Sequence, residues 1–313
     1  MSAALAASSS STTLRSVDGA ANLYAVARQW LGVIAAVALL EAVWHPLLYA
    51  LAVVWIGSRQ HALFALVHEG VHGLLHADRR WNRGLAKVLC AWPILVPYES
   101  YRRIHLLHHR YLNTPRDPDW QRNRPDRLGN LSTRSLRALL GLEGAQVRLL
   151  DFFVVGERPP GLRLEVRETW ARLSFYVLVL GAAAYGGALM VLVKYWLVPL
   201  ATWFVATMRL KGLAEHYGMD NASPIGSHTI IPTPLEGVLL SPLNFGYHAA
   251  HHASPGVPYR ALPELHALLM GTEHFRRHAP VTHSYRAFLF ERLIHTRRLS
   301  RGPTPEVGTQ PPC

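Results

Sequence analysis

The chain has 313 residues, of which half are hydrophobic and 17% are charged, yet its formal net charge at pH 7 is +12. This length allows one large domain or two small ones, and the charges it carries are mostly basic. The only cysteines are Cys90, in an apolar stretch, and Cys313, at the last position, which argues against a disulfide framework and against cysteine as the main metal ligand.

The two ends of the chain differ in composition from the part between them. Residues 1–22 are rich in Ala, Ser and Thr and lack the basic-then-apolar pattern of a cleaved signal peptide. We expect a disordered tail there, with a transit peptide as the alternative, and a second disordered tail over residues 297–313, which are rich in proline and glycine. One domain is predicted between them, over residues 23–296.

Four apolar segments in this domain have the length that a helix needs to cross a bilayer core of about 30 Å. They fall into two pairs, 24–44 with 47–67 and 173–193 with 195–213, separated by Pro46 and by Lys194. Proline disfavours a continuous helix, so the first pair is expected to be a hairpin. The pattern predicts an all-α integral membrane protein with four transmembrane helices in two hairpins, and the alternative is a set of buried soluble helices.

The basic residues lie on one side of these predicted hairpins. Residues 69–172 hold eighteen Lys and Arg and the chain from Arg209 onward holds ten, whereas the hairpin tips hold only Lys194. By the positive-inside rule, both termini and the central loop are cytoplasmic, and the protein belongs in the inner (cytoplasmic) membrane. Charge placed beside membrane spans suits anionic membrane lipids, and it is a poor match for nucleic acid.

Histidines are grouped on the same predicted cytoplasmic side. Three groups have the spacings HxxxH, HxxHH and HxxHH, and the segment Ala214-Glu215-His216-Tyr217 supplies one more histidine. Helical residues four apart share a face, and neutral imidazole is the commonest protein metal ligand. So many imidazoles exceed the needs of one tetrahedral ion. The pattern therefore predicts two metals in a cytoplasmic helical cap, held by His68, His72, His105, His108, His109, His216, His248, His251 and His252.

One group has a second interpretation. The segment His68-Glu69-Gly70-Val71-His72 satisfies the zinc-protease pattern, in which two histidines bind zinc and the glutamate acts as general base. A membrane zinc metalloprotease is therefore a distant alternative. Such a site needs only one more ligand and leaves the other two groups unexplained, so Glu69 is better interpreted as a hydrogen-bond partner that orients an imidazole.

The three groups, set around two hydrophobic hairpins, resemble those of the membrane fatty acid desaturase and hydroxylase superfamily, bacterial type. The segment Tyr101–His105, followed by Asn113-Thr114-Pro115-Arg116-Asp117-Pro118-Asp119-Trp120, is similar to the second histidine box with its acidic sequel. Asn244-Phe245-Gly246-Tyr247 before His248, and Pro255-Gly256-Val257-Pro258 after His252, are similar to the surroundings of the third. The likeness covers roughly residues 25–270.

This resemblance implies a non-haem di-iron centre with O2 as co-substrate, held by the nine histidines named above. It also implies that Asn244 contacts the metal through water, while Asp117 and Asp119 hydrogen-bond to ligand histidines. No catalytic residue beyond the metal ligands is expected. His61 and His76 flank the first group and are expected to lie outside the ligand set.

The function that the resemblance implies is an O2-dependent, acyl-lipid or acyl-CoA desaturase-like oxidoreductase that introduces a C=C bond into an acyl chain or similar lipophilic substrate from the membrane. The alternative is a hydroxylase or ketolase of the same superfamily acting on a carotenoid, a lipid or a specialised metabolite. Because no cytochrome b5 signature or cysteine cluster occurs in the sequence, electrons are expected from an external donor such as ferredoxin with its reductase.

Overall fold

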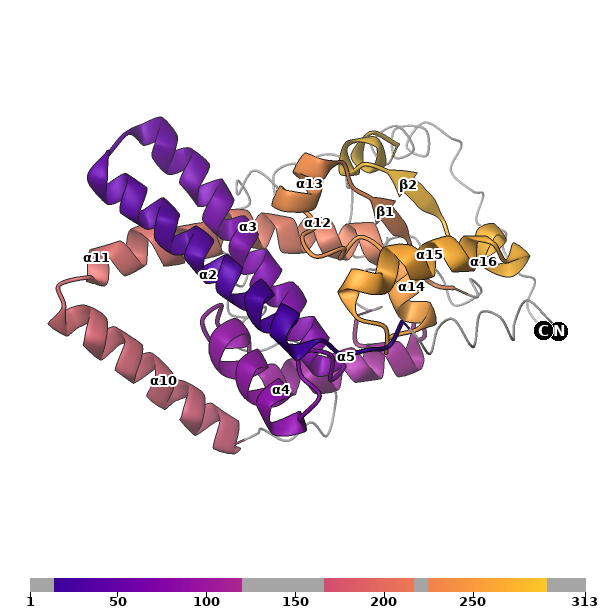
Figure 1. Ribbon diagram of the computed structural model, residues 1–313, viewed down its shortest axis with the longest axis horizontal. Coiled ribbons are helices and arrows are strands. Elements are labelled where there is room, and N and C mark those ends of the chain that lie inside the picture. Colours follow the sequence, from indigo (N-terminus) through magenta and orange to yellow (C-terminus); the bar gives the residue numbers. More distant parts are fainter. Residues whose placement is uncertain (1–13, 120–165, 217–224, 292–313) are drawn as a thin grey trace, which may run out of the picture.

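The structure is a computed structural model that describes residues 14–119, 166–216 and 225–291. These residues are mostly helical, and long helices gather at one end of the molecule while short helices and two strands gather at the other (Figure 1). The C-terminal tail predicted over 297–313 lies outside the described residues.

The first hairpin is formed by α2 (Gly19–Ala42) and α3 (Pro46–Val71). The Asp18 side chain accepts a hydrogen bond from the Ala21 backbone and caps α2, and Pro46 begins α3 where a missing N–H costs nothing. Asn22 is buried and donates to the carbonyls of Leu74 and Leu75. Ordered structure therefore begins before the predicted end of the N-terminal tail at residue 22, because these polar contacts fix the start of α2.

Helix α3 has two halves with different surroundings. From Ile56 to Val71 every residue is buried, whereas between Pro46 and Trp55 only Ala52 is. Leu47 and Leu51 are exposed apolar residues in the first half. The first half therefore has the surface of a lipid-facing helix, and the second half is the centre of the protein core.

Two helices connect the first hairpin to the second histidine group. Helix α4 (Arg79–Leu85) continues into the π-helical segment η1 (Ala86–Ala91), which packs against α3 and contains the buried, free Cys90. Helix α5 (Tyr98–Tyr111) follows and carries three histidines. Gly70 lets η1 approach α3, since a Cβ at this position would overlap the side chain of Ala86.

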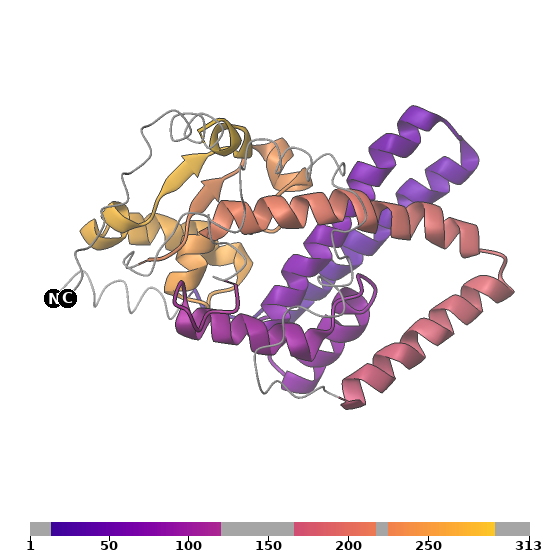
Figure 2. The same ribbon diagram turned by 180° about the vertical axis from the view of Figure 1, so that it is seen from behind.

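The second hairpin consists of α10 (Val166–Tyr185) and a longer helical run: α11 (Leu189–Leu192), the π-helical segments η2 (Val193–Leu197) and η3 (Leu200–Phe204), and α12 (Val205–His216). The π-helical segments lie on either side of Pro199, which has no N–H to donate to the ordinary helical pattern. Figure 2 shows this run crossing the molecule from the hairpin turn to the strands.

The turn of this hairpin differs from the prediction. It lies at Gly186–Ala188, where Gly187 has a φ of +65°, and the helix runs through Lys194 without a break. Three described helical runs are long and apolar enough to cross a membrane: 19–42, 46–71 and 189–216. Helix α10 is not among them, and its first two turns carry Arg167, Glu168 and Arg172.

The remaining elements form the other end of the molecule. Strands β1 (Thr229–Ile231) and β2 (Val281–His283) pair in parallel, and around them lie short helices, including residues 285–291 directly after β2. The others are α13 (Pro234–Leu239), α14 (His248–Ala253), η4 (Tyr259–Ala261), α15 (Leu262–Met270) and α16 (Glu273–His278). The described residues are mostly helical, as predicted, but the all-α prediction did not include this strand pair. The β-branched residues at 229–231 and 281–282 favour it.

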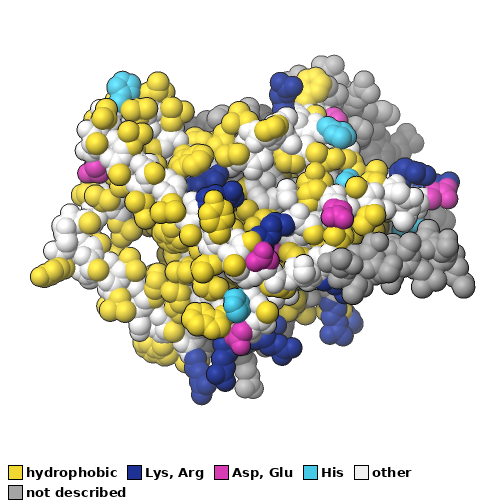
Figure 3. Space-filling view, in the orientation of Figure 1, with side chains coloured by type: hydrophobic (Ala, Val, Ile, Leu, Met, Phe, Trp, Pro, Cys, Tyr) yellow, Lys and Arg dark blue, Asp and Glu magenta, His cyan; other side chains and the backbone are white. Residues whose placement is uncertain are grey.

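Hydrophobic side chains cover the ends of both hairpins, and charged side chains gather toward the opposite end (Figure 3). Exposed apolar residues include Leu31 and Ile34 on α2 and Val177 and Leu178 on α10. This distribution fits a protein whose hairpins lie in a bilayer while the short helices and strands lie outside it.

Candidate metal centre

All nine histidines predicted as ligands come together in the structure, in two groups. The ligand atoms of each group lie within 4.8 Å of one another. The first group has five members from α3, α5 and α14, and the second has four members from α5, α12 and α14. The five are His68, His72, His105, His109 and His251, and the four are His108, His216, His248 and His252.

Helical spacing explains most of this division. Residues four apart lie on one helix face, so the pairs His68/His72, His105/His109 and His248/His252 each stay within one group. The middle histidine of each HxxHH segment crosses over: His108 joins the pair on α14, and His251 joins the pairs His68/His72 and His105/His109. Both α5 and α14 therefore contribute to both groups.

The four-histidine group has its Nε2 atoms turned inward. His108 Nε2 lies 3.1 Å from His216 Nε2 and 3.3 Å from His252 Nε2. His248 Nε2 lies 2.8 Å from His216 Nε2 and 2.9 Å from His252 Nε2. Nitrogens that surround one ion tetrahedrally at about 2.0–2.1 Å would be roughly 3.3 Å apart, so the arrangement is near that of a metal site.

Hydrogen bonds on the far side of two rings indicate which nitrogen carries the proton. His108 Nδ1 donates to Asp117 at 2.9 Å, and His216 Nδ1 donates to the Gly226 carbonyl at 3.1 Å. Each neutral ring then has only a lone pair at Nε2. Two lone pairs 3.1 Å apart repel one another unless a cation lies between them, and this is the strongest sign that the site binds metal.

The five-histidine group converges in the same way. His105 Nε2 lies 3.0 Å from Nε2 of His72 and 3.0 Å from Nε2 of His109, which is also 3.0 Å from His251 Nε2. The buried Nε2 of His68 has no hydrogen-bond partner among the described residues. Five imidazoles exceed the four ligands of a tetrahedral zinc site and suit a metal that accepts a larger coordination number.

Burial keeps most of these rings neutral. Loss of solvent lowers the pKa of His72 to about 4 and that of His109 to about 3, with the nearby cationic Arg102 adding to the effect at His72. His108 differs: burial alone would lower its pKa, but the hydrogen bond to Asp117 and the charges of both aspartates outweigh burial and raise it. Neutral rings leave the lone pairs available to a metal.

Asp117 and Asp119 differ in their distance from His108, the ligand histidine nearest to both. The buried Asp117 carboxylate accepts from His108, from the Asn113 backbone at 2.8 Å and from the Asp119 backbone at 2.9 Å. Asp119 is farther away, with an oxygen 4.0 Å from His108 Nδ1. Of the two, only Asp117 is close enough to orient the ring.

Glu69 and Asn244 both form hydrogen bonds to the backbone of Tyr259. Glu69 Oε2 accepts from the Tyr259 backbone at 3.0 Å, while Oε1 stays 3.9 Å from His68 Nδ1. Asn244, at a φ of +57°, donates to the Tyr259 carbonyl at 3.1 Å. Both side chains thus hold the loop around Tyr259 against the histidine-bearing elements.

Three supporting groups were missed from the sequence. Glu215 Oε1 lies 3.4 Å from His248 Nδ1, and the same carboxylate pairs with Lys211. Gly226 receives the His216 hydrogen bond, and the Asn113 amide donates to the same carbonyl at 2.7 Å. The position of Glu215 beside His216 was a usable signal, whereas nothing local pointed to Gly226.

Gly246 permits the close approach that places α14. Ile230 of β1 donates its N–H to the Gly246 carbonyl at 2.9 Å, and a Cβ on Gly246 would overlap the Ile230 carbonyl oxygen. Because His248 is two residues further on, this contact helps to set the position of the third histidine group.

The flanking histidines lie outside both groups. His61 is buried beside Phe245, and neither of its ring nitrogens has a partner among the described residues. His76 accepts from the Asp78 backbone and packs near Trp81. Neither residue therefore adds to the ligand set.

The fold and site define a mostly helical membrane protein with a buried histidine-rich metal site. The sequence profile of the fatty acid desaturase family matches residues 42–285, and the chain belongs to that family. Family membership implies an oxidoreductase.

Three relatives show the range of this similarity. The chain is 26% identical to dihydrorhizobitoxine desaturase of Bradyrhizobium elkanii over 71% of its own length and 68% of the relative. It is 30% identical to sphingolipid delta(4)-desaturase of Drosophila melanogaster, over 67% and 62%. It is 28% identical to beta-carotene ketolase of a Paracoccus species, over 72% and 82%. The names of the three relatives refer to chemically different substrates.

Proposed function

We propose that this protein is an O2-dependent desaturase that holds one iron ion in each histidine group and introduces a C=C bond into an acyl chain or similar lipophilic molecule. The observation that carries the proposal is the convergence of nine imidazoles on two neighbouring points. Imidazole suits iron, copper and zinc alike, and the family match favours iron. When bound, two irons would supply the activation of O2 needed to remove hydrogen from an unactivated C–H bond.

The protein's own residues position the ligands and keep water out. Asp117 and the Gly226 carbonyl fix the tautomers of His108 and His216, and Glu215 supports His248. Phe245 packs against His68 at a centroid distance of 5.2 Å and closes the five-histidine group on the side of His61. A dry site of this kind protects reactive chemistry from bulk water.

We place both termini and the histidine groups on the cytoplasmic side, with the hairpins in the membrane. The excess of Lys and Arg outside the hairpins supports this orientation. Helix α10 is proposed as the fourth membrane segment, since its exposed apolar residues Val177 and Leu178 follow the charged first turns. Electrons would come from an acidic carrier such as ferredoxin, attracted by the basic cytoplasmic surface. No role in nucleic-acid binding is proposed.

A hydroxylase or ketolase is the second candidate, because one relative is named as a carotene ketolase. The zinc-protease alternative is disfavoured by the contacts of Glu69. One Glu69 oxygen, Oε2, accepts from the Tyr259 backbone, and His68 and His72 share a group of five histidines, whereas the zinc-protease pattern needs only one ligand beyond its two histidines.

The test is metal and product analysis of the full chain, purified from membranes and supplied with O2, ferredoxin and its reductase. About two irons per chain, together with a product that has lost two hydrogens, would support a desaturase. A product that has gained one oxygen would mean the hydroxylase alternative. Zinc alone, with cleavage of a peptide substrate, would contradict both.

A further inference from the structure

A pocket lies on the opposite side of α3 from the histidines. It has a volume of about 540 Å³ and is formed by α2, the middle of α3 and the segment 237–243, which comprises the end of α13 and the turn after it. Arg59 is nine residues before His68, which places the two on opposite faces of the helix and about 13 Å apart along its axis. The pocket is therefore a separate site from the candidate metal centre.

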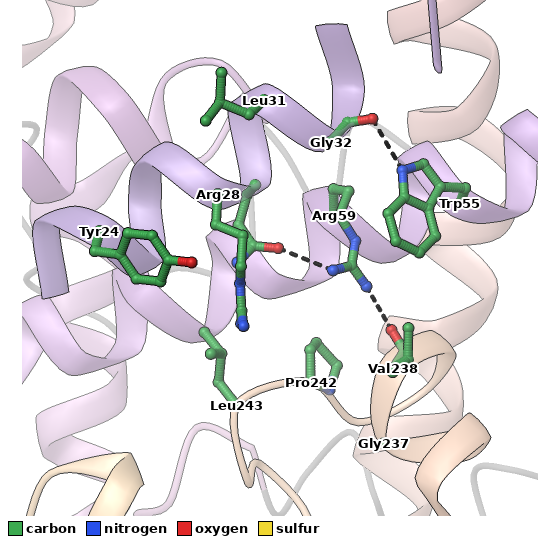
Figure 4. Close-up of a pocket in the computed structure, with 11 residues that line it drawn as sticks. Tyr24, Arg28, Leu31, Gly32, Trp55, Arg59, Gly237, Val238, Pro242 and Leu243 are labelled. Carbon is green, nitrogen blue, oxygen red and sulfur yellow. Dashed lines mark hydrogen bonds between the residues drawn. The ribbon is translucent and has the colours of Figure 1, made fainter. Parts of the chain in front are cut away.

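Two guanidinium groups line this pocket, and apolar side chains surround them. Arg28 comes from α2 and Arg59 from α3, and Leu31, Trp55, Pro242 and Leu243 supply apolar walls. Figure 4 shows both arginines reaching toward the segment 237–243, with Trp55 beside Arg59. A guanidinium stays protonated in proteins, so the pocket holds two positive charges.

Arg59 is buried without a counter-ion. Its side chain is 7% exposed and donates to Gln29 Oε1 at 3.2 Å and to the Val238 carbonyl at 2.7 Å, and both acceptors are neutral. Its Nε has no hydrogen-bond partner within the part of the chain that the structure describes, and the cation lies over the Trp55 ring at 4.4 Å. Among the described residues no carboxylate pairs with Arg28 or Arg59. A buried charge without a partner is costly, and an anion in the pocket would remove that cost.

The position of the pocket along the first hairpin bears on the source of the anion. Arg28 and Arg59 lie about 20 Å of helix from the hairpin turn, which is less than a bilayer core of about 30 Å, so a headgroup reaches them from the side of the membrane nearer to the histidines. Arg59 lies just inside the fully buried half of α3, and Trp55 is the last residue of the half that has a lipid-facing surface. Tyr24 and Trp55 are the amphipathic aromatic residues that favour the level of lipid headgroups. Figure 3 shows basic side chains within a hydrophobic surface near the middle of α2 and α3.

We propose that Arg28 and Arg59 bind the anionic phosphate headgroup of a membrane phospholipid, whose tails lie along the apolar surface of α2 and α3. Arginine suits this ligand, since its planar fork binds two phosphate oxygens at once. Arg59 donates to the Val238 carbonyl in the segment 237–243. This segment continues into Phe245, so a bound lipid also steadies the residue that packs on His61 and His68.

The test is lipid binding to the full-length protein in a neutral detergent, followed by native mass spectrometry. The probes are phosphatidylglycerol, phosphatidylcholine with the same tails, and inorganic phosphate. Wild type is expected to retain one phosphatidylglycerol in preference to phosphatidylcholine. Arg28→Gln removes one charge-assisted contact and is expected to weaken this binding roughly tenfold or more. Arg276→Gln, an exposed arginine on α16, is the matched control and should bind as wild type does.

Arg28 is exposed, so its variant should keep the fold, and unchanged metal content and helical circular dichroism would verify this. Arg59→Lys is the second variant: it keeps the charge, loses the fork and should also weaken binding. Equal retention of the two lipids, or equal binding by the Arg28 and Arg276 variants, would overturn the proposal. Displacement of the lipid by an equal concentration of inorganic phosphate would also overturn it, because the pocket would then be a site for a free oxyanion.

Discussion

The carboxylate of Asp117 lies 2.9 Å from Nδ1 of His108 and accepts its hydrogen, which leaves the Nε2 lone pair of His108 directed into the four-histidine group. Asn113 extends this relationship, since its backbone donates to Asp117 and its amide donates to the Gly226 carbonyl that orients His216. One residue thus supports the orientation of two candidate ligands on different helices.

Asp117→Asn should weaken metal binding in the four-histidine group. The Asn amide offers a single acceptor oxygen and no negative charge. Loss of the carboxylate that orients a ligand histidine typically lowers metal affinity by roughly 10–100-fold. Metal content after dialysis against a chelator measures the effect. Asp119→Asn is the control, because its carboxylate is 4.0 Å from the ring and partly exposed. Equal losses in the two variants would mean that overall charge, and not the contact with His108, determines affinity.

Single alanine substitutions should distinguish ligands from other histidines. His108→Ala and His251→Ala each remove one imidazole from a different group and should lower both iron content and activity. His278→Ala, an exposed residue on α16, should leave both near wild type. Iron analysis beside product formation checks this. If His278→Ala were as damaging as the other two, the assignment of ligands would be wrong.

Gly246→Ala should displace the third histidine group. A Cβ at this position would overlap a backbone oxygen of β1, which cannot move as a side-chain end could. We expect lower metal content and a lower thermal midpoint. Gly84→Ala is the matched control, since a Cβ on Gly84 meets nothing within 4 Å. That change lies in helix α4 and should be neutral or stabilising by up to about 1 kcal/mol.

His61→Leu should leave the metal content unchanged and should not destabilise the protein. The ring is buried, and both of its nitrogens lack hydrogen-bond partners among residues 14–119, 166–216 and 225–291, so an apolar side chain of similar size removes a desolvation penalty. His228→Leu provides the contrast, because His228 is also buried but bonds to Thr282 Oγ1 at 2.8 Å. That variant should lose roughly 1 kcal/mol or more. Thermal unfolding in detergent compares the two, and a destabilised His61→Leu would reveal a bound partner at this ring.

The capping box of α13 should make the thermal midpoint of the protein fall at acid pH. Burial alone would raise the pKa of Glu236, but hydrogen bonds from the backbones of Thr233 and Arg286 outweigh it and hold the pKa below its ordinary value. This contribution is full above the unfolded pKa of about 4.3 and is lost as pH falls through the lower folded value. The thermal midpoint of Glu236→Gln should therefore fall less than that of wild type as the pH is lowered from about 6 to about 3. Parallel curves for the two proteins would contradict this.

Spacing along the chain was enough to predict which histidines gather, because residues four apart on a helix share a face wherever the helix packs. It could not predict that His108 and His251 would exchange groups. That outcome depends on how α5 and α14 meet in space, which no local pattern records. The strand pair was missed for a similar reason: Thr229–Ile231 and Val281–His283 are three residues each and pair across a long separation. Hydropathy located the two hairpins. The turn of the second was predicted at Lys194 because this is the only charged residue there, whereas the structure places it at the glycines 186–187.

The crossing of histidines between the groups has a consequence for how the protein matures. Both groups include residues of α14, one through His251 and the other through His248 and His252. Neither site can be complete until the ribosome has released that segment, by which time both hairpins have already been synthesised. Metal loading would then come after membrane insertion, and a truncated product that ends before residue 248 would reach the membrane without a full set of ligands at either position.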